Sequence, residues 1–356
     1  MYPLLFRRRA RACFCAGLIG FALLLRLAML PGLPRMVLRR AERALGSELL
    51  FRAVLFLQTG VTELPAASPA GTATAADRGS PAAEPPAPTA AAPAGTTRTG
   101  EEIPPFTAAE AEAVTLRGNC TYPADKAALL TAPLNWTMSP GPKVLILHTH
   151  ASEAYTPSPG LDYDPSGDYR TLNADRSVVA VGDELAEQLE ALGVACVHDR
   201  GFHDYPNYNR SYADARASAK ELLARYPSIV MIIDLHRDAL EKPVRETVEL
   251  DGVTAAPLML VAGTDQGGLE HPDWARNLSC ALKLQVLLER EAPGLCKALS
   301  FRRERFNGDL SPGALIVEVG STENTLPEAL ASMPALAGAV AELLQLAEEE
   351  AGDNSE

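Results

Sequence analysis

Beyond about residue 119, short apolar runs alternate with longer segments of helical periodicity. In the segment 177–192, for example, Val178, Val181 and Leu185 share one face, and Gly193 follows as a stop signal. The strand-length runs are 143–147, 194–197, 229–235, 246–250, 257–261 and 314–319, and the helical segments are 177–192, 212–226, 274–291 and 327–350. This alternation predicts an α/β fold with a mostly parallel sheet covered by helices on both faces. A hairpin turn is expected at Asp251 and Gly252.

The N-terminal part has a different pattern. A basic cluster at 7–11 precedes an uncharged apolar run at 13–25, which Arg26 interrupts. We expect residues 1–33 to form a cytoplasmic tail and an uncleaved transmembrane anchor, with Arg26 reaching to the interface. A cleaved signal peptide is the alternative, although no A-x-A-like site follows the run. Residues 34–63 are predicted to form an amphipathic juxtamembrane helix, which lies on the membrane or packs on a partner.

Residues 64–118 are expected to be a disordered linker rich in Ala and Pro. The stretch 64–105 contains hardly any large apolar residue, so it cannot bury enough surface to offset the entropy of ordering. A folded domain is predicted over 119–350. The chain is thus interpreted as an anchor, a tether and one catalytic or binding domain.

Charge and cysteine content narrow the possible functions. Residues 1–60 carry ten Arg and two acids, a charge of +8, so the net charge of −13 leaves −21 for the remainder. So acidic a domain is a poor nucleic-acid binder, and we expect no nucleic-acid partner. The six cysteines include no C-x-x-C pair in the domain, which argues against a cysteine zinc site and a disulfide framework. Any metal site must use His and carboxylates.

Ionisable residues follow or end three of the predicted strands. The first strand leads into His148, Thr149, His150 and Glu153; the central one ends in Asp234, His236, Arg237 and Asp238; the last contains Glu318. The carboxyl ends of parallel strands meet at one edge of a sheet, where α/β proteins form their sites. Two His and several carboxylates at this edge predict a zinc site of the hydrolytic kind. Structural His and ion-paired Glu residues are the alternative reading.

Each of these residues is given a role. His150, Glu153 and His236 are the predicted metal ligands, and the H-x-x-E spacing places two of them on one turn. Glu318 is the predicted general base, because an apolar strand desolvates it and raises its pKa. Supporting or substrate-binding roles are expected for His148, Asp234, Arg237, Asp238, Asn307 and Asn324. The aromatic loop 203–212 either stacks on a substrate or packs over the sheet edge.

Three segments resemble the stage II sporulation protein P family, in order and over about 143–330. They are His148-Thr-His150-Ala-Ser-Glu153, Asp234-Leu-His236-Arg237-Asp238 and Leu315-Ile-Val-Glu318-Val-Gly320, with Phe306-Asn307-Gly308-Asp309 just upstream of the last. More distantly, they resemble zinc N-acetylmuramoyl-L-alanine amidases, with His150, His236 and Glu318 in the places of two ligands and the catalytic Glu. In those amidases the third ligand is a Glu at the start of the next helix. That helix here opens with Asp175 and no Glu, so Glu153 is the expected third ligand and Asp175 the alternative.

The resemblance implies an amidase-like fold and a Zn²⁺-dependent peptidoglycan hydrolase. It implies cleavage of the amide between N-acetylmuramic acid and L-alanine, and also endopeptidase activity on stem peptides, during engulfment in sporulation. It implies two partners, a stage II lytic transglycosylase (protein D) and a membrane protein (protein M). The implied location is the cell membrane at the sporulation septum, with the domain on the wall side. The alternatives are a zinc carboxypeptidase on wall peptides and a non-catalytic wall-binding scaffold.

Overall fold

The computed structural model describes residues 105–166, 168–239 and 244–353. The predicted anchor, the juxtamembrane helix and most of the linker lie outside these residues. Within them, seven strands form the main sheet, in the order β1-β8-β7-β9-β4-β2-β3. Their bounds, in that order, are Leu116–Gly118, Leu299–Arg302, Leu258–Gly263, Gly313–Ser321, Met231–Asp238, Val144–Leu147 and Cys196–His198. All neighbours pair parallel except β7 and β9, which pair antiparallel, so the predicted mostly parallel sheet is confirmed.

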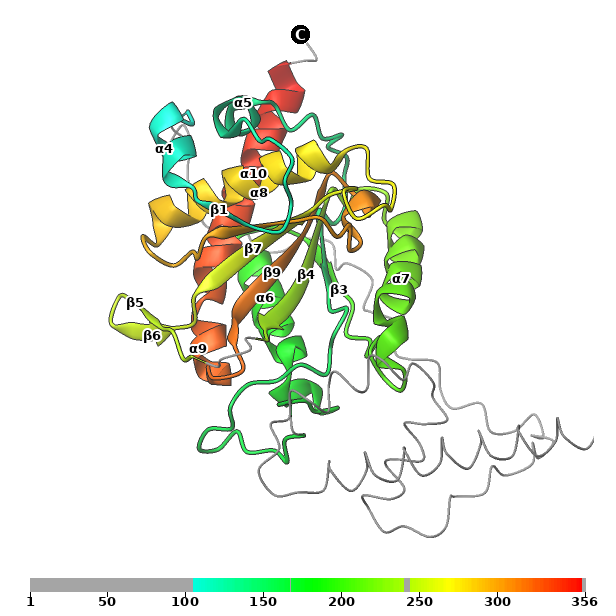
Figure 1. The fold of residues 1–356 in the computed structure, drawn as a ribbon, viewed down its shortest axis with the longest axis vertical. Helices are drawn as coiled ribbons and strands as arrows, with labels where there is room; N and C mark the ends of the chain where they lie inside the picture. Colours follow the sequence, from blue (N-terminus) through cyan, green and yellow to red (C-terminus); the bar gives the residue numbers. More distant parts are fainter. Residues whose placement is uncertain (1–104, 167, 240–243, 354–356) are drawn as a thin grey trace, which may run out of the picture. The chain divides into compact units, whose positions relative to one another are not determined.

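Helices cover both faces of this sheet, as the sequence predicts (Figure 1). One face packs against α6, α8 and α10, and the other against α7. The helices are α4 (Ala108–Ala113), α5 (Lys126–Thr131), α6 (Val178–Ala191), α7 (Ser211–Arg225), α8 (Trp274–Glu291), α9 (Leu326–Ala331) and α10 (Met333–Asp353). The α6 helix begins where the Ser177 hydroxyl accepts a hydrogen bond from the Val179 amide, a usual N-cap arrangement.

The folded domain begins earlier than the predicted boundary at residue 119. The end of the expected linker forms α4 and strand β1, because its few apolar residues find partners in the domain. Phe106 and Leu116 pack against the core, Val114 is buried in it, and β1 pairs with β8. A capping box between Thr107 and Glu110 starts α4.

Two other elements differ from the prediction. The turn at Asp251 and Gly252 joins β5 (Val248–Leu250) to β6 (Val253–Ala255), which form a separate two-stranded sheet, while the run 257–261 enters the main sheet as β7. The predicted terminal helix is divided at Ser332, whose hydroxyl donates to the Ala256 carbonyl. Pro334 then lies in the first turn of α10, where its missing N–H costs nothing.

In the described part of the chain, one stretch is long and apolar enough to span a membrane, at Leu326–Gly352. The most apolar part of this stretch is 61% buried inside the domain, and α10 packs against α6 and α8. The stretch comprises α9 and most of α10, and it is therefore part of the core of this domain. The predicted anchor, at 1–33, lies outside the described residues.

Candidate active site

Strand alternation places His236 and Glu318 side by side. They occupy paired positions on the parallel strands β4 and β9. Side chains two residues apart point to the same face of a strand, so His236 lies on the face of Ile232, and Glu318 on that of Ala314. Ile232 and Ala314 pack in the cluster that includes α7 residues. The histidine and the carboxylate therefore both lie on the α7 face, near the carboxyl ends of their strands.

A tight turn after β2 brings His150 and Glu153 to the same place. The Glu153 amide donates to the His150 carbonyl at 3.0 Å, so the H-x-x-E spacing forms one turn. Glu153 Oε2 then lies 3.2 Å from His236 Nδ1, and the His150 and His236 rings are 5.3 Å apart between centroids. Asp175, the alternative ligand, is exposed on the turn before α6. The structure thus brings together His150, Glu153 and His236.

His236 and the carboxylates beside it shift one another's pKa values. Burial opposes its protonation, but the carboxylates of Asp234 and Glu153 outweigh burial and raise the pKa of His236 well above its ordinary value. Burial also opposes ionisation of Glu153, yet its contact with His236 and the nearby Arg237 lower the pKa of Glu153 to about 2. The pKa of the neighbouring His150 is shifted the opposite way from that of His236, because burial lowers it to about 4. The carboxylates of Asp234 and Glu153 therefore stabilise the protonated form of His236.

Glu318 has the raised pKa that its apolar strand predicts. Burial, together with the carboxylates of Glu153 and Asp238, raises the pKa of Glu318 to about 8, although the His236 charge opposes the shift. A carboxyl group with a pKa near neutrality can both accept and return a proton, as general acid–base catalysis requires. This arrangement suits the role of a proton carrier beside His150 and His236.

Three atoms of this cluster lack hydrogen-bond partners among the described residues. They are His150 Nδ1, His236 Nε2 and Glu318 Oε2, all buried. His236 Nε2 lies 3.0 Å from Asp234 Oδ1, an ion-pair contact that lacks hydrogen-bond geometry. Buried polar atoms without partners cost free energy, so we expect a bound ion, a water molecule or a substrate to satisfy them.

The residues fit zinc by ligand type. Imidazole nitrogens and carboxylate oxygens are ligands that zinc takes in hydrolytic sites. The described residues contain no preformed group of three or more His, Cys, Asp or Glu side chains arranged around an ion. The fit is therefore one of donor chemistry and proximity, with Glu153 engaged by Arg170 and His236 instead.

Asp234 and Arg237 position the loop and the histidine. Asp234 accepts hydrogen bonds from the Thr149 amide at 2.7 Å and the Thr149 hydroxyl at 2.6 Å, so it joins the end of β4 to the loop after β2. Arg237 is 2% exposed and donates to the carbonyls of Ala154 and Asp168. Both residues therefore support the turn that carries His150 and Glu153.

His148 belongs to a separate chain of polar groups that runs from the buried end of β2 to the partly exposed Asp183. Its Nδ1 lies 3.1 Å from the Leu235 carbonyl, and its Nε2 lies 2.8 Å from His198 Nε2. His198 Nδ1 in turn contacts Asp183 Oδ1 at 3.1 Å. Burial lowers the pKa of His148 to about 3, so it is neutral, donates from Nδ1 and accepts at Nε2. The chain fastens α6 to the end of β2.

The aromatic loop covers His150. Tyr208 stacks on the His150 ring at 4.6 Å between centroids, and Tyr212 contacts the same ring edge-on at 5.6 Å. Arg170 lies 4.8 Å above the Tyr208 ring and also contacts Glu153 and Asp204. The loop packs over the sheet edge while Tyr208 remains 51% exposed, and stacking of the loop on a substrate stays a prediction.

The remaining predicted residues have structural contacts. Asn307 donates to the Tyr212 carbonyl, and Asn324 is 1% exposed and bonded to Ser321, Glu246 and Glu328. A Cβ on Gly320, where φ is +60°, would lie 2.6 Å from Asn324 Oδ1. Asp238 is two residues beyond His236, after an irregularity in the strand pairing, and burial raises its pKa.

Several contributors are not evident from the sequence pattern. Arg170 lies in a polar loop without periodicity, so nothing in the sequence marks it as a partner of Glu153. His198 does carry a signal, because it directly follows the run 194–197 as His148 follows 143–147. The strand-end argument, applied to every strand, identifies it.

Comparison with known proteins identifies the family. The model of the family "Stage II sporulation protein P (SpoIIP)" matches residues 64–341. The curated stage II sporulation protein P of Bacillus subtilis (strain 168) is 29% identical over 200 residues, which are 52% of this chain and 47% of that protein. The chain thus spans about half the length of this curated relative.

Solved structures of two amidases give weaker similarity. The N-acetylmuramyl-L-alanine amidase Ami1 of Mycobacterium smegmatis is 14% identical, covering 59% of this chain and 99% of its own, with a TM-score of 0.36. The N-acetylmuramoyl-L-alanine amidase of Clostridium difficile 630 is 13% identical, covering 58% and 96%, with a TM-score of 0.35. Similarity at this level supports no conclusion about chemistry. The family model matches most of the chain, and this protein therefore belongs to the stage II sporulation protein P family.

Proposed function

We propose that this protein is a zinc-dependent peptidoglycan hydrolase that cleaves the amide between N-acetylmuramic acid and L-alanine. The observation that supports it most is the group formed by His150, Glu153, His236 and Glu318, in which three buried polar atoms lack partners among the described residues. Family membership supports a role in the cell wall during sporulation.

In this proposal His150, Glu153 and His236 hold the ion. A bound zinc ion supplies Lewis-acid chemistry, polarising the amide carbonyl and making a water molecule more acidic. Glu318 accepts the proton of the attacking water and returns it to the leaving amine, for which its pKa of about 8 is suited. Asp234 and Arg237 hold the two ligand-bearing segments in place.

The cellular setting is part of the same proposal. An N-terminal anchor holds the domain at the sporulation septum, on the wall side of the membrane, where peptidoglycan is its substrate. The stage II lytic transglycosylase and membrane protein implied by the family are its partners. Cleavage of stem-peptide cross-links is a second activity of the same site.

The test is digestion of purified sacculi by the full-length protein, followed by mass analysis. Sugar-free stem peptides are expected as products, and a chelator should abolish them until zinc is restored. Peptides shortened by one residue but still attached to sugar would instead indicate a carboxypeptidase. Binding without any cleavage, in zinc-supplied protein, would indicate a scaffold and contradict the proposal.

A further inference from the structure

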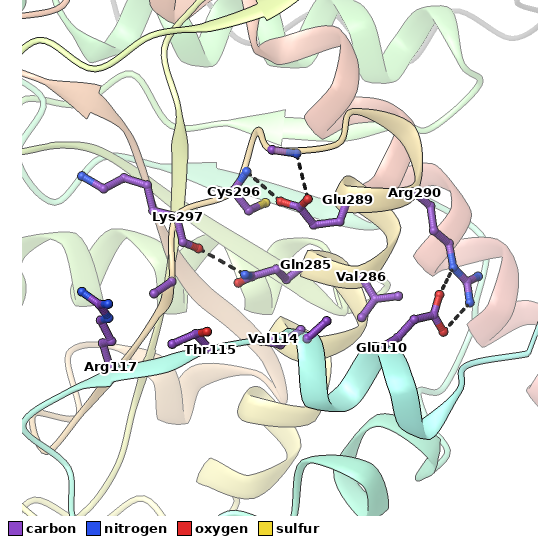
Figure 2. A pocket seen from close by; sticks show the side chains of 13 residues that line it. Glu110, Val114, Thr115, Arg117, Gln285, Val286, Glu289, Arg290, Cys296 and Lys297 are labelled. Atoms are coloured by element: carbon purple, nitrogen blue, oxygen red, sulfur yellow. Dashed lines mark hydrogen bonds and ion pairs between the residues drawn. The ribbon is translucent and has the colours of Figure 1, made fainter.

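A cavity of about 460 Å³ lies away from the four candidate catalytic residues. It is bounded by α4, by the C-terminal half of α8 and by the residues that lead into β1 and β8 (Figure 2). Its volume falls within the range of pockets that hold small molecules and short peptides.

This cavity lies at the same end of the sheet as the candidate active site. Because β7 runs antiparallel to β9, its first residue, Leu258, pairs with Val319, next to Glu318. Leu258 also bridges to Cys296, which lines the cavity. Two strand spacings of about 4.8 Å separate Cys296 from Val319, so the cavity wall lies roughly 10 Å from the backbone at Glu318. The lining helix α8 packs on the face of the sheet opposite α7, so the cavity and the side chains of His236 and Glu318 lie on opposite faces of the same sheet end.

Gln285 supplies a buried acceptor without a partner in the described part of the chain. Its side chain points toward Thr115 and Lys297 (Figure 2), and the residue is only 5% exposed. The amide Nε2 donates to the Lys297 carbonyl at 3.1 Å, which fixes Oε1 as the atom left without a hydrogen bond. A buried carbonyl without a donor costs about 1–3 kcal/mol, and an N–H group of a ligand would remove that cost.

The cavity also has a cationic side. Arg117 is exposed and makes no ion pair within the described residues. Lys297 contacts Glu246 at 2.7 Å and keeps 30% of its side chain exposed. The acids of the lining are already engaged: Glu110 pairs with Arg290, and Glu289 accepts from the amides of Gly294 and Cys296. The free charge offered to a ligand is therefore positive.

We propose that this cavity is an accessory subsite for an acidic peptide segment. A carboxylate of the segment pairs with Arg117, and a backbone N–H donates to Gln285 Oε1. The inference rests on the proposed function for its source of ligand, the stem peptides of the cell wall. It gives the enzyme a second contact with wall peptide, on the face of the sheet opposite His236 and Glu318.

The test measures binding of a small probe, which does not depend on hydrolysis. N-acetyl-Ala-Glu carries carboxylates and amide N–H groups, and N-acetyl-Ala-Gln-amide is its uncharged counterpart. Neither contains a sugar amide, so neither is a substrate of the proposed reaction. Binding of each to the full-length protein is measured by calorimetry for wild type, Arg117→Gln and Gln285→Met, with Arg303→Gln, an exposed arginine outside the cavity, as the matched control.

We expect the acidic probe to bind wild type and Arg303→Gln equally, and Arg117→Gln about tenfold more weakly, the usual effect of losing a charge-assisted hydrogen bond. Gln285→Met should weaken both probes. Equal binding to wild type and Arg117→Gln, or no binding of the acidic probe to wild type at millimolar concentration, would overturn the subsite. Binding as expected by a protein that leaves sacculi intact would instead refute the hydrolase and keep the subsite.

Discussion

Glu318 has a raised pKa although it lies beside a histidine, whose positive charge alone would lower the pKa of a carboxylate. It belongs to an apolar strand that raises its pKa to about 8, and it lies opposite a histidine whose charge is stabilised by other carboxylates. Glu318→Gln keeps the shape and removes the ability to carry a proton. We expect kcat on sacculi to fall by about 10²–10⁴-fold, the usual contribution of a general base.

The control for this prediction is Glu323→Gln, in the loop that follows β9. Glu323 is partly exposed and is not among the proposed catalytic residues. Its substitution should leave kcat unchanged. Equal activities of Glu318→Gln and wild type, at equal thermal stability, would exclude Glu318 as the base.

We expect burial of Lys283 to make the free energy of unfolding depend on pH. It is 2% exposed on α8, and burial lowers its pKa from 10.5 to about 8. The folded state therefore disfavours its charge by up to about 3 kcal/mol below pH 8, a penalty that is relieved as pH rises from 8 to 10.5. Lys283→Met should raise the free energy of unfolding at pH 7 by about 1–2 kcal/mol, after loss of the hydrogen bond to the Leu130 carbonyl.

Denaturant unfolding at pH 7 and pH 10 measures this effect. The gain should shrink at the higher pH, because the wild-type lysine is then neutral in the folded state. Lys220→Met, at an exposed position on α7, should show no such dependence. A gain that grows with pH would contradict the assignment.

At the residue scale, the strand-end argument could predict the proposed ligands and base but not their present contacts. His150, His236 and Glu318 each follow or end an apolar run. Because β2, β4 and β9 pair in parallel, the carboxyl ends of these strands bring the three side chains to one edge of the sheet. The contact between Arg170 and Glu153 joins a loop to a turn, with no periodic pattern to reveal it. The amides of Asn307 and Asn324 looked available for substrate, yet backbone groups use them.

At the element scale, α6 depends on a glycine that helix propensity disfavours. Gly182 lies where a Cβ would be 2.5 Å from Nε2 of both His148 and His198. Alanine would gain about 1 kcal/mol in propensity, but the clash with a fixed histidine pair should cost more, about 1–3 kcal/mol. Gly182→Ala should therefore lower the melting temperature.

The matched control is Gly352→Ala, in α10, where an added Cβ meets nothing within 4 Å. There propensity acts alone, and the melting temperature should stay the same or rise slightly. A rise for Gly182→Ala as well would show that the histidine pair yields easily and does not fasten α6 to β2.

Elements with strong periodicity could be predicted, and those that depend on tertiary pairing could not. The bounds of α8 agree with the predicted 274–291, because Leu278, Leu282 and Val286 recur at helical spacing. Strand β1 has three residues and exists through its pairing with β8. Strand β6 also has three residues, which is too short to show a pattern. The sequence therefore predicts the longer run that forms β7 as the hairpin partner of β5.

At the scale of the whole molecule, reversal of strand direction between β9 and β7 decides at which end of the sheet the cavity lies. It brings the start of β8, and with it the cavity beside Gln285, to the sheet end where His236 and Glu318 lie on the opposite face. A sheet that is parallel throughout would place that cavity at the opposite end. The antiparallel pair could not be predicted from the sequence, because a buried strand has the same apolar pattern in either direction.

The central claim is that His150, Glu153 and His236 hold zinc, and bound-metal analysis of the purified full-length protein tests it most directly. Mass spectrometry of the metal content should find about one zinc per chain in wild type, and little in His150→Ala and His236→Ala whose circular dichroism matches wild type. Wild-type protein that stays free of metal after incubation with zinc, or variants that retain as much zinc as wild type, would contradict the account.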